Sequence, residues 1–490
     1  MNREKYPCYG KPSSVLNCPV PCHLADLRHF ASHARFRPVE LPAGADARAA
    51  SNRARLAIRI RPPRVFNGLA TVKIVARFKL PPLLVNATLP PAAALFSHVE
   101  MAPRDPILGV NESFNADSNP NKVNLGVGVY TDEAGKIPVL ECVKRAEVAM
   151  AEKSAPRGYL PIDGIAAYDK ATQALVFGAE SAIVRENRAV TVQTLGGTGA
   201  LKVGADFLKR VTPASVVYIS NPSWENHRAL FESAGFEVRD YAYYDAATRS
   251  LDFPGFLDSV KAMPQGSVVV LHACCHNPTG VDPTLDQWKE VAAAVRAGGL
   301  VPFLDMAYQG FGDGVEQDGA VVKLFGSTPG PIFVSSSFSK SFSLYGERIG
   351  ALSVVATDKD EAGRVLSQLK RVIRTNYSNP PTHGGAIIAA ALTDPQARAL
   401  WEKELGEMRD RIKAMRVALH AALKRLAPDA NFENILTQRG MFSYSGLSKD
   451  QVHRLRNEFG VYAVDSGRIC VAALNQKNVN YVAESIAKVL

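Results

Sequence analysis

The sequence predicts an α/β protein in which a mostly parallel sheet lies between helices, followed by a smaller C-terminal α/β domain. From about residue 95 onward, short apolar runs of strand length alternate with longer runs of helical periodicity. This alternation is typical of a parallel sheet with crossover helices. Glycine-rich and polar motifs follow several of the predicted strands. Because ligands of such sheets bind beyond the carboxyl ends of the strands, the motifs indicate one site at that edge.

The predicted elements follow one another through the body of the chain. An arm and turn are expected at 105–109, and a strand at 123–130 contains glycines that admit close approach of another group. Further strands are predicted over residues 190–194, 215–220, 267–271, 300–304 and 332–334. Helices are predicted over residues 139–152, 200–208, 225–234, 285–297 and 401–425. The last of these has an apolar stripe formed by Met408, Ile412, Met415, Leu419 and Leu423.

Residues 1–94 form a basic leader that differs from the rest of the chain. This segment has a net charge of +11 and the rest of the chain a net charge of −1, so the formal net charge of +10 belongs to the leader, which is also rich in proline. An Arg-rich, acid-poor composition is typical of transit peptides, and a disordered tail or translated sequence outside the working protein are the alternatives. We expect the leader to be dispensable. The remaining chain is divided into an arm with the first part of the small domain (95–137), a large domain (138–407) and a small C-terminal domain (408–490).

Composition and charge limit the possible function classes. Apolar residues make up 47% of the chain, but no run of about 18 of them predicts a membrane helix. The basic leader has no clear helix-turn-helix pattern and is interrupted by prolines, so nucleic acid is not a predicted partner. The cysteines show no disulfide framework, which favours a reducing compartment. Cys18, Cys22 and His23 lack a second pair of ligands, so no metal site is predicted.

A serine-rich stretch around Lys340 is the most informative motif. It follows the apolar run at 332–334, so Lys340 is delivered near the interior, where desolvation lowers the pKa of its amine. A neutral amine is what condensation with an aldehyde requires. The hydroxyls of Ser335, Ser337 and Ser339 and the guanidinium of Arg348 can bind a phosphate group. An amine beside a phosphate site suggests pyridoxal phosphate (PLP).

Polar residues after the other strands suit the same cofactor. Asp305 ends the strand at 300–304, where a carboxylate can bind a protonated pyridine nitrogen. Tyr308 and Asn277 can both reach the phenolate oxygen of the ring. Trp224 follows another strand and can stack on a flat ring.

Two further motifs can bind anions. Gly197 and Thr198 belong to a glycine-rich turn between a strand and a helix, where exposed amides and the helix dipole attract phosphate. Arg468 can bind a carboxylate through two parallel hydrogen bonds. Each motif alone also fits an ordinary structural role, such as a solvated turn, a helix cap, core packing or a surface charge. Their occurrence together and in this order favours a PLP site.

The chain closely resembles the class I, fold type I aminotransferases, and most of all the bacterial aromatic-amino-acid (tyrosine) and aspartate aminotransferases. The resemblance runs from about Leu95 to Leu490 and leaves the leader unmatched. Its signature stretches are residues 193–201, 221–227, 274–280, 305–310, 337–350 and 376–381. The implied fold is that of the PLP-dependent transferases, with a seven-stranded, mostly parallel sheet in the large domain.

The resemblance also implies roles for individual residues. Lys340 bonds to PLP and then shuttles the proton, while Asp305 pairs with the pyridine nitrogen with support from His227. The other expected cofactor ligands are Gly197, Thr198, Trp224, Asn277, Tyr308, Ser337 and Arg348, with Tyr159 reaching in from a second subunit. The expected substrate ligands are Gly128, Trp224, Asn277 and Arg468, with Arg374 of the second subunit binding a distal carboxylate.

The predicted function is therefore an aminotransferase that moves the amino group of aromatic and acidic L-amino acids to 2-oxoglutarate by a ping-pong mechanism. Its expected partners are amino acids, 2-oxo acids and a second copy of the chain with shared active sites, and its expected location is the cytoplasm. A strict aspartate aminotransferase is one alternative. A PLP-binding transcription regulator with a basic N-terminal module and another PLP enzyme such as a lyase are the others.

Overall fold

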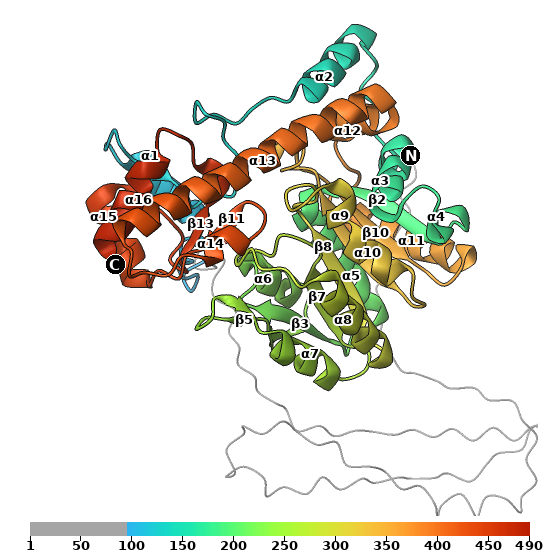
Figure 1. Ribbon diagram of the computed structural model, residues 1–490. Coiled ribbons are helices and arrows are strands. Elements are labelled where there is room, and N and C mark those ends of the chain that lie inside the picture. Colours follow the sequence, from blue (N-terminus) through green and yellow to red (C-terminus); the bar gives the residue numbers. More distant parts are fainter. Residues whose placement is uncertain (1–95) are drawn as a thin grey trace, which may run out of the picture. The chain divides into compact units, whose positions relative to one another are not determined.

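The structure is a computed structural model that describes residues 96–490, of which residues 101–490 form one compact unit (Figure 1). The predictions made for residues 1–94 lie outside the described residues. A seven-stranded sheet in the order β2-β10-β9-β8-β7-β3-β4 is the centre of the compact unit. Its strands are β2 (Ala189–Leu195), β3 (Val216–Asn221), β4 (Glu237–Ala242), β7 (Val268–His272), β8 (Val301–Met306), β9 (Ile332–Ser337) and β10 (Ile349–Val355).

Six of the seven strands run in the same direction, and β10 runs against both of its neighbours. The pairing of β8 with β7 and β9 sets Asp305 opposite His272 on one side and Ser335 on the other. The carboxyl ends of the six co-directional strands therefore meet at one edge. The predicted motifs after β2, β3, β7, β8 and β9 all begin at this edge.

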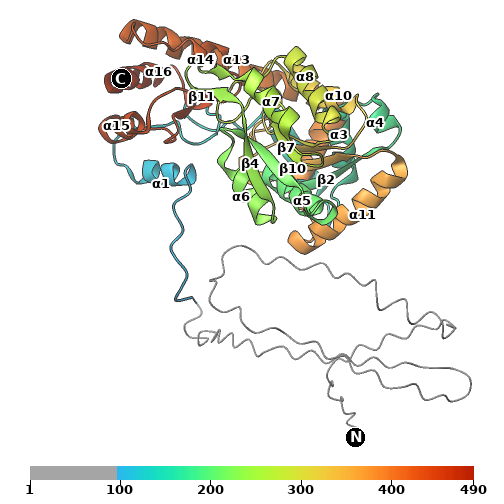
Figure 2. The same cartoon turned by 90° about the horizontal axis from the view of Figure 1, so that it is seen from below.

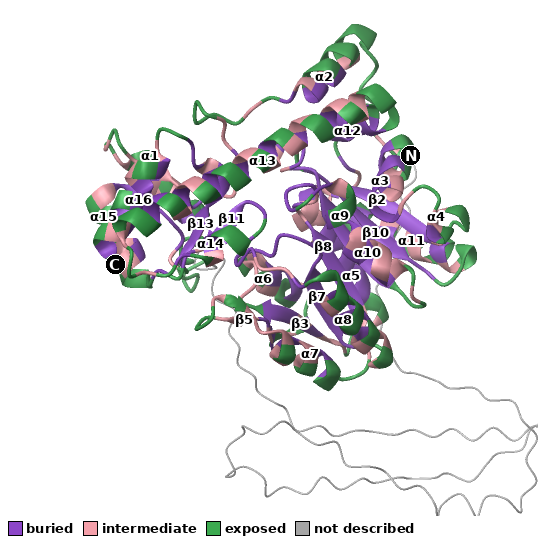
Figure 3. Ribbon diagram, viewed as in Figure 1, coloured by how far each residue is buried: buried purple, intermediate pink, exposed green. Residues whose placement is uncertain are grey.

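Helices cover both faces of the sheet (Figures 1 and 2). The helix α5 (Gly196–Val211) packs on β2, β9 and β10, and it also contacts α6 (Glu225–Ser233) and α11 (Lys359–Asn376). The helices associated with the opposite face are α3 (Ala166–Phe177), α4 (Ala182–Arg185), α7 (Phe253–Ala262), α8 (Leu285–Ala297), α9 (Val315–Asp318), α10 (Ala320–Gly326) and α12 (His383–Thr393). Apart from β3 and the edge strand β4, the strands are almost wholly buried, as Figure 3 shows for the centre of the sheet, and the two faces supply two separate apolar cores.

A smaller assembly is built from both ends of the described chain. Here β1 (Val123–Asn124) pairs with β12 (Val461–Tyr462), and β11 (Phe442–Tyr444) pairs with β13 (Arg468–Cys470). The accompanying helices are α1 (Leu108–Ala116), α14 (Asn434–Thr437), α15 (Lys449–Phe459) and α16 (Val479–Val489). The 32-residue helix α13 (Pro395–Leu426) contacts α16 at one part of its length and α12 and α2 (Glu141–Lys153) at another (Figure 1).

Local sequence signals explain where α8 and α13 begin, although α13 was predicted to begin at residue 401 and begins at Pro395. At α8, the Thr284 side chain accepts a hydrogen bond from the amide of Gln287, and the Gln287 side chain accepts one from the amide of Thr284. This capping box fixes the start of the helix at Leu285, as predicted. At α13, Asp394 caps the first turn and Pro395 occupies its first position, where a missing amide hydrogen costs nothing.

The predicted fold class is confirmed, with local corrections. The predicted strand at 123–130 is wrong beyond Asn124, because the following residues line the site as irregular backbone. The predicted turn at 196–199 is also wrong, because α5 begins at Gly196 itself. The domain boundaries at 137 and 407 stay predictions. No helix between residues 96 and 490 is both long and apolar enough to cross a membrane.

Candidate active site

A cavity of about 240 Å³ opens at the carboxyl edge of the sheet. Of the site residues expected from the sequence, eleven line it: Gly128, Gly197, Thr198, Trp224, Asn277, Asp305, Tyr308, Ser337, Lys340, Arg348 and Arg468. They come from segments separated by up to 340 residues of sequence. Most of them follow strands whose carboxyl ends lie at one edge of the large sheet, whereas Gly128 and Arg468 come from the smaller assembly.

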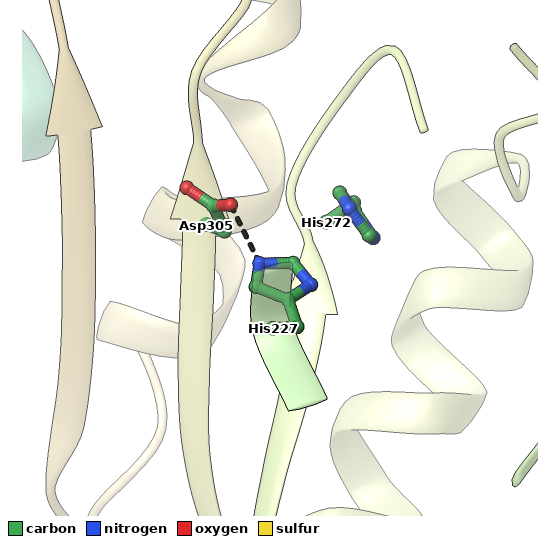
Figure 4. A group of neighbouring side chains, drawn as sticks. All are labelled: His227, His272 and Asp305. Carbon is green, nitrogen blue, oxygen red and sulfur yellow. Dashed lines mark hydrogen bonds and ion pairs between the residues drawn. The ribbon is translucent and has the colours of Figure 1, made fainter. Parts of the chain in front are cut away.

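Asp305 is a buried carboxylate with a hydrogen-bonded histidine behind it (Figure 4). His227 donates from Nε2 to Asp305 Oδ2 at 2.9 Å, and its Nδ1 lies 2.9 Å from the Ser223 hydroxyl. Burial alone raises the pKa of a carboxyl group, but the His227 hydrogen bond and the nearby Lys340 outweigh it and lower the pKa of Asp305. The cavity therefore has an anionic carboxylate at its base.

Lys340 supplies a buried amine. Burial lowers its pKa to about 8, and the positive charges of Arg348 and Arg468 act in the same direction against the opposing effect of Asp305. The ammonium nitrogen lies 5.1 Å from the centre of the Tyr308 ring. An appreciable fraction of this amine is neutral at physiological pH, and a neutral amine is a nucleophile and a base.

The start of α5 and Arg348 together form an anion site. The first-turn residues Gly197 and Thr198 line the cavity, and the positive end of the helix dipole lies there. Gly196 adopts a φ of +68°, and a Cβ atom at this position would lie 2.5 Å from Nη2 of Arg348. Glycine is therefore required for the close approach of the guanidinium to the helix start.

Arg348 is held in a strained position. Its φ of +52° lies in the left-handed region, which non-glycine residues rarely adopt. Its Nη1 donates to the carbonyl of Tyr345 at 3.0 Å and to the Ser339 hydroxyl at 3.3 Å. Of the three serines expected at the phosphate, Ser337 and Ser339 line the cavity. Ser335 does not line it, because its hydroxyl donates to the carbonyl of Gly197.

Arg468 is almost completely buried and has one free edge. Nη1 donates to Asn277 Oδ1 at 3.0 Å, and Nη2 donates to the carbonyl of Gly126 at 2.8 Å. Its Nε has no hydrogen-bond partner among the described residues, although it is buried. An unpaired buried N–H is costly, so a guanidinium edge beside the cavity fits a carboxylate ligand.

The aromatic lining frames the same space. Burial raises the pKa of the Tyr308 phenol, so the hydroxyl stays protonated and can donate a hydrogen bond. The Trp224 ring lies edge-on to His227, with 5.2 Å between the ring centres. Tyr308, Trp224 and Asn277 thus lie around the carboxylate and the amine, as the sequence predicts for a planar aromatic cofactor.

Three expected residues do not line the cavity. His227 lies behind Asp305, in agreement with its expected supporting role. Tyr159 is 99% exposed, and Arg374 is exposed and hydrogen-bonded to Ser378. Their expected action in a second subunit stays a prediction.

Sequence reasoning missed several lining residues, of which His272 is the most notable. It ends β7 with its ring centre 5.0 Å from that of His227, and neither of its ring nitrogens has a partner among the described residues (Figure 4). Burial lowers its pKa to about 3, so the imidazole is neutral. A histidine closing an apolar strand was the available signal. The other missed lining residues are Ile107, Val127, Val129, Leu201, Ala307, Tyr345 and Phe442.

Comparisons with known proteins agree with this geometry. Residues 120–486 match the family model of class I and II aminotransferases. The chain is 62% identical over 397 residues to an aspartate aminotransferase of Pseudomonas aeruginosa, covering 81% of this chain and all of the relative. It is 50% identical to an aromatic-amino-acid aminotransferase of Escherichia coli, with 81% of this chain and 100% of the relative covered. The structure of an aromatic-amino-acid aminotransferase from Burkholderia pseudomallei, covalently bound to PLP, is 63% identical with a TM-score of 0.79; 81% of this chain and 99% of that one are covered.

The chain therefore belongs to the class I and II aminotransferase family. It is a PLP-dependent aminotransferase of fold type I, and the expectations for fold, enzyme class and cofactor are confirmed. The residues around the cavity fit PLP, because an anionic carboxylate, a partly neutral amine and a helix start with an arginine match the ring nitrogen, aldehyde and phosphate of the cofactor.

Proposed function

We propose that the protein transfers the amino group of aromatic and acidic L-amino acids to 2-oxoglutarate in two half-reactions that share one site. The observation that carries the proposal is the position of Lys340 in one cavity with Asp305, Arg348 and the free edge of Arg468. Relatives named for aspartate, tyrosine and aromatic amino acids support this range of substrates.

In this proposal the large-domain residues hold PLP. Asp305 pairs with the pyridine nitrogen, and His227 keeps the carboxylate ionised and oriented. Gly197, Thr198, Ser337 and Arg348 bind the phosphate. Trp224 stacks on the ring, while Asn277 and the protonated Tyr308 bind its phenolate oxygen.

The substrate lies between Lys340 and Arg468. When bound, PLP supplies an electron sink that makes the proton on the substrate Cα acidic. Arg468 binds the α-carboxylate through its free edge, with Gly128 and Asn277 alongside, and this fixes the orientation of Cα. Nζ of Lys340 accepts the proton from Cα and can return it later, because a pKa of about 8 makes both protonation states accessible.

A second copy of the chain completes the site in this proposal. Tyr159 and Arg374 are exposed and do not line their own cavity, which leaves both side chains available to a neighbouring subunit. Tyr159 would contact the phosphate, and Arg374 would bind the distal carboxylate of an acidic substrate. In this proposal the working protein is a homodimer, and its location is the cytoplasm.

A steady-state substrate panel tests the proposal. The full chain with PLP is assayed with aspartate, glutamate, tyrosine, phenylalanine and leucine, each with 2-oxoglutarate. Turnover of aspartate and of both aromatic substrates is expected, with parallel lines in double-reciprocal plots, which indicate a ping-pong mechanism. Turnover of acidic substrates alone would favour a strict aspartate aminotransferase, the function in the name of the 62% identical relative. No amino transfer from any of the five would contradict the proposal.

A further inference from the structure

Phe442 is a cavity-lining residue to which sequence reasoning gave no role. Its side chain is 2% exposed, and the centre of its ring lies 4.2 Å from the guanidinium carbon of Arg468. A cation at this distance from an aromatic face is attracted by the negative charge density of the ring, and the attraction is stronger where water is excluded. Arg468 and Phe442 are both buried, so this contact is of the stronger kind.

The short sheet of β11 and β13 fixes the contact. Phe442 lies opposite Cys470, and Tyr444 lies opposite Arg468, in antiparallel register. Because side chains alternate along a strand, Phe442 and Arg468 project from the same face as diagonal neighbours. The carbonyl of Phe442 also accepts a hydrogen bond from the buried Arg416 of α13. The backbone of Phe442 is therefore fixed both by its pairing with β13 and by the hydrogen bond from Arg416.

The Phe442 ring also contacts other parts of the cavity wall. It lies edge-on to the Tyr308 ring, with 5.7 Å between the ring centres. A Cβ atom at Gly128 would lie 2.7 Å from the tip of the Phe442 ring, so the backbone of Gly128 lies directly against it. The ring therefore contacts Arg468, Tyr308 and the backbone of Gly128, three parts of one cavity wall.

The hydrogen bonds of Arg468 do not by themselves fix the plane of its guanidinium. Nη1 and Nη2 each donate to one acceptor and the buried Nε has none among the described residues, so these bonds leave the guanidinium plane free to tilt about the axis through Nη1 and Nη2. A ring stacked on the guanidinium opposes that tilt. An edge that is held in advance binds a planar carboxylate with less loss of conformational freedom.

We propose that Phe442 is a positioning residue for substrate recognition, which holds the guanidinium of Arg468 so that its free edge faces the α-carboxylate. The inference rests on the proposed function, because it takes Arg468 as the carboxylate ligand. Its test therefore uses binding of a carboxylate that cannot react.

The test compares Phe442→Met with the wild-type holoenzyme. Methionine is apolar and of similar size, but it has no aromatic face. The dissociation constant of succinate, a dicarboxylate without an amino group, is measured by titration calorimetry. We expect binding to weaken about five- to thirty-fold, the range of a desolvated cation–π contact. In steady state, KM for aspartate should rise by a similar factor while kcat falls much less, and the visible absorbance of bound PLP should be unchanged.

Phe325→Met is the matched control. Phe325 is fully buried and also faces a guanidinium, that of Arg296 at 6.0 Å, but it does not line the cavity. Both variants should lower the thermal unfolding midpoint, and only Phe442→Met should weaken succinate binding. In an Arg468→Lys background, Phe442→Met should have little further effect on that binding.

Three results would overturn the inference: unchanged succinate binding in Phe442→Met, an equal loss in Phe325→Met, or no succinate binding by the wild-type protein. Failure of the proposed function looks different. In that case, succinate binding would depend on Phe442 as described, while the wild-type protein would transfer no amino group in the substrate panel.

Discussion

Asp305 stays ionised inside the protein because its neighbours outweigh the effect of burial. The His227 hydrogen bond and the charge of Lys340 lower its pKa, although desolvation acts in the opposite direction. The desolvation of a buried carboxylate is unfavourable unless a positive group pairs with it, and the protonated ring nitrogen of PLP is such a group.

Asp305→Asn should therefore impair catalysis much more than cofactor binding. The amide has nearly the same size but carries no charge, so the pairing with the ring nitrogen is lost. We expect kcat to fall by a factor on the order of 10² or more, corresponding to about 3 kcal/mol for a broken buried pair. Stopped-flow absorbance of the half-reaction with aspartate measures the rate. A rate within a factor of about three of the wild type would mean that the charge of Asp305 is not used.

The amine of Lys340 should titrate well below an ordinary lysine. Burial first, and then Arg348 and Arg468, lower its pKa from 10.5 to about 8. Between these two values the unfolded chain holds a proton that the folded, cofactor-free protein lacks. The folded state is therefore stabilised as the pH rises from about 8 to 10.5. Below about pH 8 the amine is charged in both states, and the full cost of burying that charge destabilises the folded protein.

Labelling with acetic anhydride, which reacts only with neutral amines, measures this pKa. In the cofactor-free protein, the rate constant at Lys340 should rise about tenfold per pH unit up to about pH 8 and then level off. Mass spectrometry follows the modified peptide, with Nα-acetyl-lysine amide added as a reference amine whose rate constant is expected to keep rising above pH 9. Parallel profiles for Lys340 and the reference amine would contradict the lowered pKa.

At the scale of elements, the long helix α13 supports the cavity wall that contains Phe442 and Arg468 through one buried cation, Arg416. Arg416 is 3% exposed and donates to the carbonyls of Ile435, Gly440 and Phe442. Burial lowers its pKa to about 10, so it remains charged at neutral pH. The guanidinium connects the long helix to α14 and β11, which carries Phe442.

Arg416→Met should destabilise the protein by about 3 kcal/mol, because three buried carbonyl groups lose their donor. Urea unfolding followed by circular dichroism measures the change. Lys413→Met is the control on the same helix, where the lysine is half exposed and only 3.3 Å from Asp313 at the surface. Its effect should stay within about 1 kcal/mol. Equal effects of the two substitutions would show that the buried hydrogen bonds of Arg416 contribute little.

Strands β2, β3, β7, β8 and β9 were predicted because their signals are local, whereas strand β10 was not predicted, although it lies inside the sheet and all of its residues are buried. Buried strands such as β7 and β8 contain continuous apolar runs, and α8 begins with a capping box formed by Thr284 and Gln287. The edge strand β4 was not predicted, because Glu237, Arg239 and Asp240 give it a largely exposed and charged pattern. An edge strand needs no apolar face on its solvent side, so its pairing with β3 carries little sequence signal.

The site was predicted mainly where motifs follow strands. Lys340, Asp305 and Arg348 stand in such motifs, and the topology of the sheet brings them together. Phe442 could not be predicted in this way, because its contact with Arg468 depends on the register of β11 and β13 and on a single ring orientation. No local pattern distinguishes this phenylalanine from an ordinary core residue.

For the whole molecule, the main prediction concerns the second subunit. Arg374 lies in the last turn of α11 on the exposed surface, where it can serve a neighbouring cavity. Arg374→Leu should lower kcat/KM for aspartate by a factor that corresponds to a loss of about 3–5 kcal/mol in transition-state binding, because the distal carboxylate loses its partner. Phenylalanine has no such carboxylate, so its kcat/KM should change little or improve. Equal losses for the two substrates would indicate a structural role for Arg374, and a monomeric active enzyme in sedimentation would exclude sharing between subunits.

The central claim is that amino transfer depends on Lys340 as the group that moves the Cα proton. The most direct measurement is the half-reaction of the PLP-loaded Lys340→Ala protein with aspartate, followed by absorbance beside the wild type. We predict that the variant still binds PLP and aspartate, because Asp305, Arg348 and Arg468 remain, but that transamination is slower by a factor on the order of 10⁴ or more. A Lys340→Ala protein that completes the half-reaction at a near wild-type rate would contradict the account.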